Sequence, residues 1–232
     1  MTIKLIVALD FDNQPTAMTL VDRLDPTLCA LKVGNEMFTL LGPDFVRSLV
    51  ARQFKVFLDL KFHDIPNTVA RACKASADLG VWMLNVHASG GLAMMKAARE
   101  ALEAYGPLRP LLIAVTVLTS MSAEELLLSG LNQSLENRVS DLARLALAAE
   151  VDGVVSSALE VPSIKAACGQ KFLTITPGIR LRTDSQDDQS RVITPEQAIK
   201  AGSDYLVVGR SITRASKPAS VVDELLSMIN KD

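Results

Sequence analysis

The chain has 232 residues, of which 49% are hydrophobic and 22% are charged, a composition that fits a globular protein and excludes a disordered one. Its 24 Lys and Arg residues against 26 Asp and Glu residues give a formal net charge of −2, which argues against nucleic-acid binding through a broad basic surface. No run approaches the roughly 18 apolar residues that a membrane span needs. The first apolar stretch closes on Asp10 and Asp12, which argues against a signal peptide.

The cysteines and histidines indicate the compartment and argue against a metal site. Cys29, Cys73 and Cys168 are odd in number and far apart, so they form no disulfide framework and no metal-knuckle spacing. Only His63 and His87 are available, which argues against a His-rich metal centre. The sequence therefore predicts a reducing, cytoplasmic setting and no bound metal.

Short apolar runs recur along the chain, and each is followed by a helix-like pattern. The runs predict eight strands, in chain order Leu5–Leu9, Cys29–Val33, Val56–Leu60, Val81–Val86, Leu111–Leu118, Gly153–Val155, Phe172–Ile175 and Tyr205–Val208. The amphipathic segments between them predict helices over Pro15–Leu24, Glu36–Arg52, Asn67–Leu79, Leu92–Tyr105, Ser134–Ala149, Leu159–Ala167, Pro195–Ala201 and Ser211–Ile229. Ser122 with Glu125, and Thr194 with Gln197, have the spacing of capping boxes.

Eight strand–helix units in this length predict a single-domain (β/α)8 TIM barrel, an α/β fold, over residues 1–232. A doubly wound open sheet is the main alternative, because alternation alone fits both folds. The longest stretch without a helical pattern is Thr176–Thr194, and a loop of that length in a compact domain is usually functional.

Charged residues occur on one face of the first three predicted strands. In the third strand Phe57, Asp59 and Lys61 alternate with aliphatic residues, and Asp10 and Lys32 hold similar positions in the first two. We expect the aliphatic faces to pack against helices and the charged faces to point into the barrel, at the strand ends where barrel enzymes place their chemistry. A structural ion network is the alternative, but burying charges is costly and a fold that needed only stability would place aliphatic residues there.

The residues after Lys61 leave two interpretations open. Asp64 is either a helix N-cap or a second carboxylate near Lys61. His63 is expected to be structural, because neighbouring residues of an extended segment point in opposite directions. His87, on the same strand face as Asn85, is a candidate for supporting the charged residues.

A phosphate site is predicted after the last two strands, where barrel enzymes commonly bind phosphate. Gly178 and Arg180 follow the seventh strand, and Gly209 and Arg210 follow the eighth. Glycine allows the backbone to approach an anion and arginine supplies forked donors. Gln189, on the long loop, is either an amide donor to the phosphate or a solvated loop residue.

These residues together indicate a metal-free enzyme that acts on a small phosphorylated molecule. A lysine flanked by carboxylates stays protonated, because opposite charges favour its charged form. Such a lysine is a poor Schiff-base nucleophile but can donate a proton to a developing carbanion. Proton transfer or decarboxylation is therefore favoured over imine chemistry.

Several segments resemble the orotidine 5′-phosphate decarboxylase family. The main one is Asp59-Leu-Lys61-Phe-His-Asp64-Ile-Pro-Asn67-Thr68. The others are Val7-Ala-Leu-Asp10, Leu31-Lys-Val-Gly34, Val115-Thr-Val-Leu-Thr119, Thr176-Pro-Gly-Ile-Arg180 and Val208-Gly-Arg210. They occur in the family's order and span nearly the whole chain. The Asp-x-Lys-x-x-Asp core alone is shared with related barrels such as keto-gulonate-phosphate decarboxylase.

The resemblance implies the last step of UMP synthesis, in which orotidine 5′-phosphate loses CO2 without a metal or organic cofactor. It implies that Lys61 donates a proton to C6 of the pyrimidine, within a charged network that also contains Lys32, Asp59 and Asp64. It further implies a homodimer in which Asp64, Ile65 and Thr68 reach the partner's site.

The remaining roles implied by the resemblance concern the rest of the nucleotide. Asp10 and Lys32 would contact the ribose and Thr119 would hold the nucleotide. The phosphate would be bound by Arg180, Gln189, Gly209 and Arg210, and the loop Thr176–Thr194 would include a closing segment. Two alternatives stay open: a related Mg²⁺-dependent sugar-phosphate decarboxylase or epimerase, and a non-catalytic barrel that binds a phosphorylated ligand.

Overall fold

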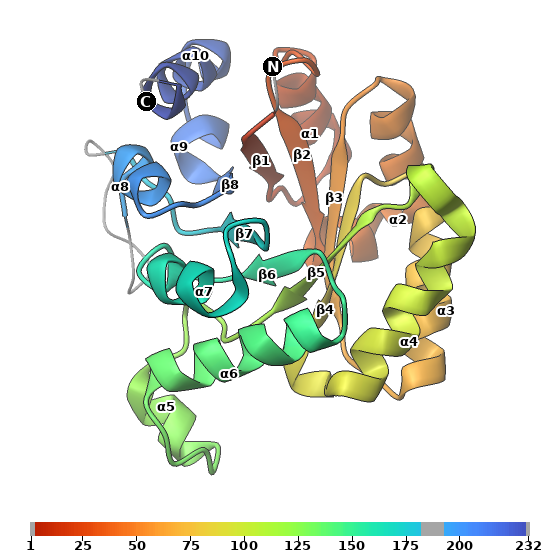
Figure 1. Cartoon of the computed structure of the whole chain (residues 1–232). Helices are drawn as coiled ribbons and strands as arrows, with labels where there is room; N and C mark the ends of the chain where they lie inside the picture. Colours follow the sequence, from red (N-terminus) through yellow and green to blue (C-terminus); the bar gives the residue numbers. More distant parts are fainter. Residues whose placement is uncertain (1–2, 182–192, 231–232) are drawn as a thin grey trace.

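The computed structural model describes residues 3–181 and 193–230, and these form a closed barrel of eight parallel strands that are hydrogen-bonded in chain order (Figure 1). The strands are β1 (Leu5–Leu9), β2 (Ala30–Gly34), β3 (Val56–Phe62), β4 (Met83–His87), β5 (Leu111–Val115), β6 (Gly153–Val155), β7 (Leu173–Thr176) and β8 (Tyr205–Val208). Because β1 pairs with both β2 and β8, the sheet has no open edge. The predicted TIM barrel is confirmed, and the open-sheet alternative is wrong.

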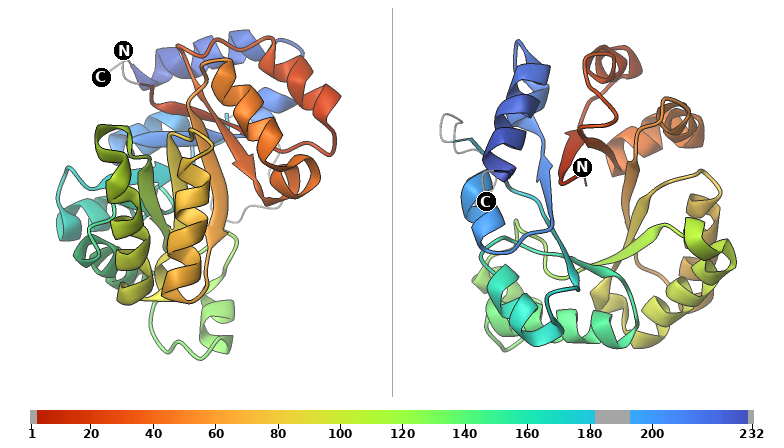
Figure 2. Two further views of the ribbon diagram at one scale, coloured as in Figure 1. Left: turned by 90° about the vertical axis from the view of Figure 1, so that its right-hand side faces the viewer. Right: turned by 45° about the horizontal axis from the view of Figure 1, so that its top comes forward.

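Helices surround this barrel on the outside (Figure 2). The α-helices are α1 (Gln14–Val21), α2 (Asn35–Ala51), α3 (Pro66–Ala77), α4 (Leu92–Leu102), α5 (Ala123–Leu128), α6 (Leu135–Ala148), α7 (Val161–Cys168), α8 (Pro195–Lys200), α9 (Arg210–Thr213) and α10 (Pro218–Ile229). Two short 3₁₀ segments cover Ala88–Gly90 and Glu103–Leu108. Within residues 3–181 and 193–230, no helix has the length and apolarity to cross a membrane.

The alternation of side chains along each strand divides the core in two. One set, which includes Val56 and Leu58, packs between the strands and the helices. The other set fills the barrel interior and consists of Ile6, Ala8, Ala30, Phe57, Met83, Ile113, Ile175 and Val207. The expected orientation of the aliphatic faces is thus confirmed, and the residues that follow Phe57 on its own face are directed to the carboxyl end of the barrel.

Most helix and strand ends lie within a few residues of the predicted ones, but three elements differ. The long last helix is interrupted, because α9 ends at Thr213 and Pro218 begins a separate helix. A kink divides α2 at Gly42, which takes φ 66° before Pro43. The short helix α5 begins at the capping box of Ser122, where the sequence showed a start signal but no long periodic pattern.

Both predicted capping boxes are formed. The Ser122 hydroxyl accepts from the Glu125 N–H at 3.1 Å, and the Glu125 carboxylate accepts from the Ser122 N–H at 2.7 Å. Thr194 and Gln197 exchange the equivalent two bonds at the start of α8. Each pair satisfies donors that the first helical turn leaves without partners inside the helix.

Candidate active site

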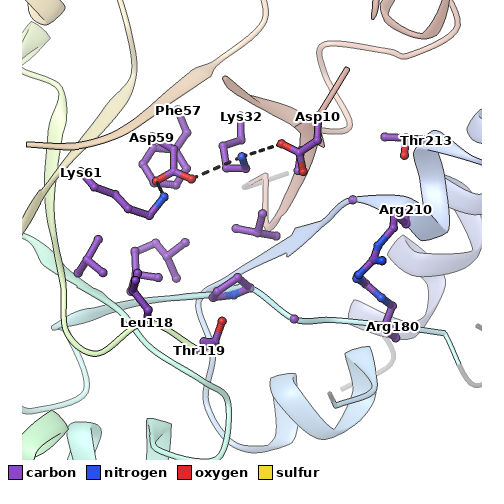
Figure 3. A pocket seen from close by; sticks show the side chains of 18 of the residues that line it. Asp10, Lys32, Phe57, Asp59, Lys61, Leu118, Thr119, Arg180, Arg210 and Thr213 are labelled. Atoms are coloured by element: carbon purple, nitrogen blue, oxygen red, sulfur yellow. Dashed lines mark hydrogen bonds and ion pairs between the residues drawn. The ribbon is translucent and has the colours of Figure 1, made fainter. Parts of the chain in front are cut away.

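A cavity of about 660 Å³ opens at the carboxyl ends of the barrel strands (Figure 3). Its volume suits a small-molecule ligand. Eight of the residues predicted for the site line it: Asp10, Lys32, Asp59, Lys61, Thr119, Arg180, Gly209 and Arg210. Phe57, Val155, Ile175 and Val207 lie deeper and give the cavity an apolar base.

Asp10, Lys32, Asp59 and Lys61 form a row of alternating charges along one wall, which we call the charged row (Figure 3). The Lys61 Nζ donates to Asp59 Oδ1 at 2.7 Å. The Lys32 Nζ lies 3.4 Å from Asp59 Oδ2 and 3.2 Å from Asp10 Oδ1. Lys32 lies on β2, Asp59 and Lys61 lie on β3, and Asp10 directly follows β1. These neighbouring strands are the ones on which the charged residues were expected.

The charges of the row hold one another in their ionised forms. Burial on its own raises the pKa of Asp59, but the charges of Lys32 and Lys61 and the hydrogen bonds from Lys61 and Asn85 outweigh it, so this pKa is lowered. Burial on its own lowers the pKa of Lys32, but Asp59 and Asp10 outweigh it, so this pKa is raised. Asp59 and Lys32 are therefore both charged at neutral pH inside a largely buried wall.

Lys61 occupies an unusual backbone position, which the sequence did not indicate. It has φ 52°, in the left-handed region where a residue with a long side chain is strained by about 1–3 kcal/mol. The strand is irregular there, because Leu58 pairs with Leu84 while Phe62 pairs with Val86. The four steps along β3 thus span the same distance as two along β4, and the extra residues form a bulge at the site.

Asn85, on β4, holds both the bulge and the charged row. Its Oδ1 accepts from the Lys61 N–H at 2.8 Å, and its Nδ2 donates to Asp59 Oδ1 at 2.7 Å. Asn85 was expected only to share a strand face with His87, and it had no predicted role. The available signal was a polar residue, two positions before His87, in an otherwise apolar strand.

The two predicted arginines lie at the side of the cavity away from Lys61, with their guanidinium groups turned toward one another (Figure 3). Arg180 is 9% exposed, and its Nη1 donates to the Ile179 carbonyl at 3.1 Å. Gly178 has φ 79°, which allows the chain to turn sharply before Arg180. Separate loops after β7 and β8 therefore bring two cations to one wall, as predicted.

The first described residues after β7 pack against the barrel. Ile179, which lies in the stretch without a helical pattern, is fully buried in the core. The Arg180 N–H donates to the Ile193 carbonyl at 3.2 Å, so the two described ends of the loop lie side by side. Gln189 lies outside the described residues.

Two further cavity residues, Thr213 and Arg214, were missed. Both follow Arg210 on or directly after the short helix α9, and Arg214 is four positions beyond it. Residues four apart share a helix face, so that spacing was the signal that could have found Arg214. The predicted helix over Ser211–Ile229 left Arg210 out, whereas α9 begins at Arg210 and has Arg214 as its C-cap.

Asp64, Ile65 and Thr68 do not line the cavity of their own chain. Asp64 is exposed, and its Oδ1 accepts from the adjacent Ile65 N–H at 2.6 Å. The N-cap of α3 is Ile65 and makes no side-chain cap bond, so the N-cap interpretation of Asp64 is wrong. Ile65 is 68% exposed.

The two histidines lie beside each other, with ring centroids 5.6 Å apart. His63 is exposed and His87 is half-buried. Burial is the main reason that the pKa of His87 is lowered, and the charges of His63 and Lys61 lower it further. The lowered pKa favours the neutral form of His87 near the charged row.

The carboxylates of the site are arranged for lysine and not for a metal ion. Across residues 3–181 and 193–230, no group of three or more His, Cys, Asp or Glu side chains is placed to hold a metal. Lys32 lies between Asp10 and Asp59, in the space where a cation bound to both would sit. These donors fit an organic ligand beside two ammonium groups.

Comparisons with known proteins agree with this geometry. The family model described as "Orotidine 5'-phosphate decarboxylase / HUMPS family" matches residues 3–225. The orotidine 5′-phosphate decarboxylase of Legionella pneumophila (strain Paris) is 65% identical over 226 residues, which cover 97% of this chain and 99% of that protein. That of Vibrio vulnificus (strain YJ016) is 57% identical over 228 residues, which cover 98% of each chain. The crystal structure of orotidine 5′-phosphate decarboxylase from Lactobacillus acidophilus matches with a TM-score of 0.88 and 39% identity, and covers 99% of this chain and 100% of that one.

Proposed function

The chain belongs to the orotidine 5′-phosphate decarboxylase family, a family of carboxy-lyases that act in pyrimidine synthesis, and from this premise we propose that it converts orotidine 5′-phosphate to UMP and CO2 with Lys61 as the proton donor. The observation that carries the proposal is the Lys61 ammonium held 2.7 Å from Asp59 at the cavity wall. We further propose that residues 1–232 form one catalytic domain.

The reaction breaks the bond between C6 of the pyrimidine and the carboxylate carbon, and the electron pair of that bond stays on C6. An ammonium group held beside C6 stabilises this developing charge and then transfers one proton to form the C6–H bond. Lys61 becomes neutral and regains its proton from solvent. Lys61 is suited to this role because its side chain is 29% exposed at the cavity, whereas that of Lys32 is 11% exposed and is held by two carboxylates.

Asp59 and Lys32 serve mainly to place the donor. Asp59 accepts from Lys61, and Lys32 with Asn85 occupies the other contacts of the carboxylate. A donor fixed in this way needs little rearrangement when charge develops on the substrate. We assign Asp10 and Lys32 to the ribose, and Thr119 to the nucleotide at the opposite wall.

The phosphate is assigned to the other side of the cavity, where Arg180, Arg210 and Gly209 lie. Guanidinium groups form strong, geometrically defined hydrogen bonds with phosphate oxygens. Gln189 is assigned to the same group on the family resemblance alone. The phosphate would then be bound away from C6, so that its binding energy can hold the reacting end in place.

We also propose a homodimer in which Asp64, Ile65 and Thr68 complete the partner's site. The exposure of Asp64 and Ile65, only three and four residues after Lys61, supports this proposal. A partner subunit that covered Ile65 would remove apolar surface from water, which is favourable. The cytoplasmic location remains a prediction from the cysteine content.

The reaction and the absence of a metal requirement are tested together. Purified protein with orotidine 5′-phosphate is expected to form UMP and CO2 in equal amounts, as followed by ultraviolet absorbance and product analysis. An excess of EDTA is expected to leave the rate unchanged, because an ammonium group and not a metal stabilises the developing charge. Inhibition by EDTA that Mg²⁺ reverses would support the metal-dependent alternative, and binding without turnover would support the non-catalytic one.

Replacing Arg210 by alanine is expected to weaken recognition of the phosphate. The loss of a charge-assisted contact of about 1.5–3 kcal/mol corresponds to a fall of about 10- to 150-fold in kcat/KM for orotidine 5′-phosphate. Orotidine, which lacks the phosphate, is the matched control and should lose no more than about 2-fold. An equal loss of kcat/KM for both substrates would show that Arg210 does not act by binding the phosphate.

A further inference from the structure

We propose that Asn85 is a positioning residue for catalysis, which fixes the Lys61 ammonium by binding both the Lys61 backbone and the Asp59 carboxylate. The proposal rests on the assignment of Lys61 as proton donor. It adds a residue that touches no cavity surface and that neither the sequence motifs nor the cavity lining identifies.

The bulge in β3 creates the need for such a residue. Between Leu58 and Phe62 the strand contains two more residues than the facing segment of β4. The backbone groups of a bulge lose their ladder partners, and a buried N–H without a partner is unfavourable. The Lys61 N–H lies in this bulge, and the Asn85 side chain supplies the acceptor that the strand cannot.

The same amide connects the backbone of Lys61 to its charge. Asp59 Oδ1 accepts from Asn85 Nδ2 and from Lys61 Nζ, both at 2.7 Å. Asn85 therefore fixes the Lys61 backbone through its own Oδ1. Through Asp59 it also fixes the Nζ at the end of the lysine side chain. An amide is suited to this role because it is neutral and carries an acceptor oxygen and a donor nitrogen on the same carbon.

Because Asn85 is buried, its positioning of Lys61 can be distinguished from a direct role in ligand binding. Asn85 is fully buried and is not among the residues that line the cavity. Water has no access to replace either hydrogen bond, and a ligand in the cavity does not touch the amide. A change at Asn85 should therefore alter the rate of the chemical step and leave ground-state binding of the nucleotide nearly unchanged.

Two variants remove different parts of the arrangement. Asn85→Leu keeps the branching of the side chain at Cγ and removes both hydrogen bonds, whereas Asn85→Asp keeps an acceptor for the Lys61 N–H but turns a second oxygen toward Asp59. Thr174→Val is the matched control, because Thr174 is equally buried and donates to Asp204 at the amino-terminal end of the strands. The Thr174→Val variant also loses a buried hydrogen bond, but Thr174 does not contact the charged row.

We expect Asn85→Leu to lower kcat by about 100-fold, since a displacement of about 1 Å can have that effect on a reacting group. KM and the dissociation constant of UMP should stay within about 3-fold of the parent enzyme. Asn85→Asp should lower kcat by at least about 10-fold, and Thr174→Val by less than about 2-fold. Backbone amide hydrogen exchange at Lys61 should accelerate in Asn85→Leu and stay slow in Asn85→Asp.

The proposal is overturned if Asn85→Leu keeps kcat within about 3-fold of the parent. It is also overturned if kcat and UMP affinity fall together, or if Thr174→Val loses as much activity, since either result indicates a general loss of structure. Should Asn85→Leu not fold, Asn85→Asp carries the same kinetic test, because its shape matches asparagine. Activity retained by Lys61→Ala would instead overturn the donor assignment, whatever the Asn85 variants do.

Discussion

Replacing Lys61 by alanine is expected to lower kcat for orotidine 5′-phosphate by at least about 10⁴-fold, because one substitution removes both the proton donor and the charge that stabilises the carbanion. A loss of that size raises the barrier by more than about 5 kcal/mol. The barrel should stay folded, because Asp59 keeps its contacts with Lys32 and Asn85. We expect a melting temperature within about 5 °C of the parent.

A matched lysine elsewhere in the chain provides the control for this variant. Lys171 is exposed and precedes β7, at the end of the barrel opposite to the cavity. Lys171→Ala makes the same chemical change and should retain full activity. The donor assignment is wrong if Lys61→Ala, confirmed as folded by circular dichroism, converts orotidine 5′-phosphate at a rate near that of the parent.

Mixing two inactive dimers is expected to restore activity. Asp64→Ala alone should lose about 100-fold or more in kcat/KM, because a charge that completes the partner's site is missing. In a hybrid with Lys61→Ala, one site carries both substitutions and the other carries neither. After complete exchange of equal amounts, half of the dimers are hybrids, so about a quarter of the parental activity should return.

The control for this experiment comes from the geometry of a single chain. Asp59 and Lys61 are hydrogen-bonded to each other within one subunit, so both belong to the same site. A mixture of Asp59→Ala and Lys61→Ala dimers forms hybrids in which both sites are damaged, and no recovery is expected. If subunit exchange is demonstrated and the Asp64→Ala mixture shows no more recovery than this control, the shared site does not exist.

The sequence by itself determined the eight strand–helix units, the inward direction of the charges and the end of the fold at which Arg180 and Arg210 lie. Each of these follows from a local pattern: the period of two places Phe57, Asp59 and Lys61 on one face, and the recurring apolar runs and amphipathic segments mark the strands and helices. Arg180 and Arg210 could be placed because the loops after the last two strands meet at one end of any such barrel.

Only the tertiary structure decided how the charges are paired and how Lys61 is held. The bulge in β3 depends on its register with β4, and the positive φ of Lys61 and the two bonds of Asn85 follow from that register. Register is a relation between strands that are distant in sequence, so the periodicity of a single strand does not predict it. Side-chain alternation is a property of one strand, whereas the partners of a buried polar group are set by its neighbours across the sheet.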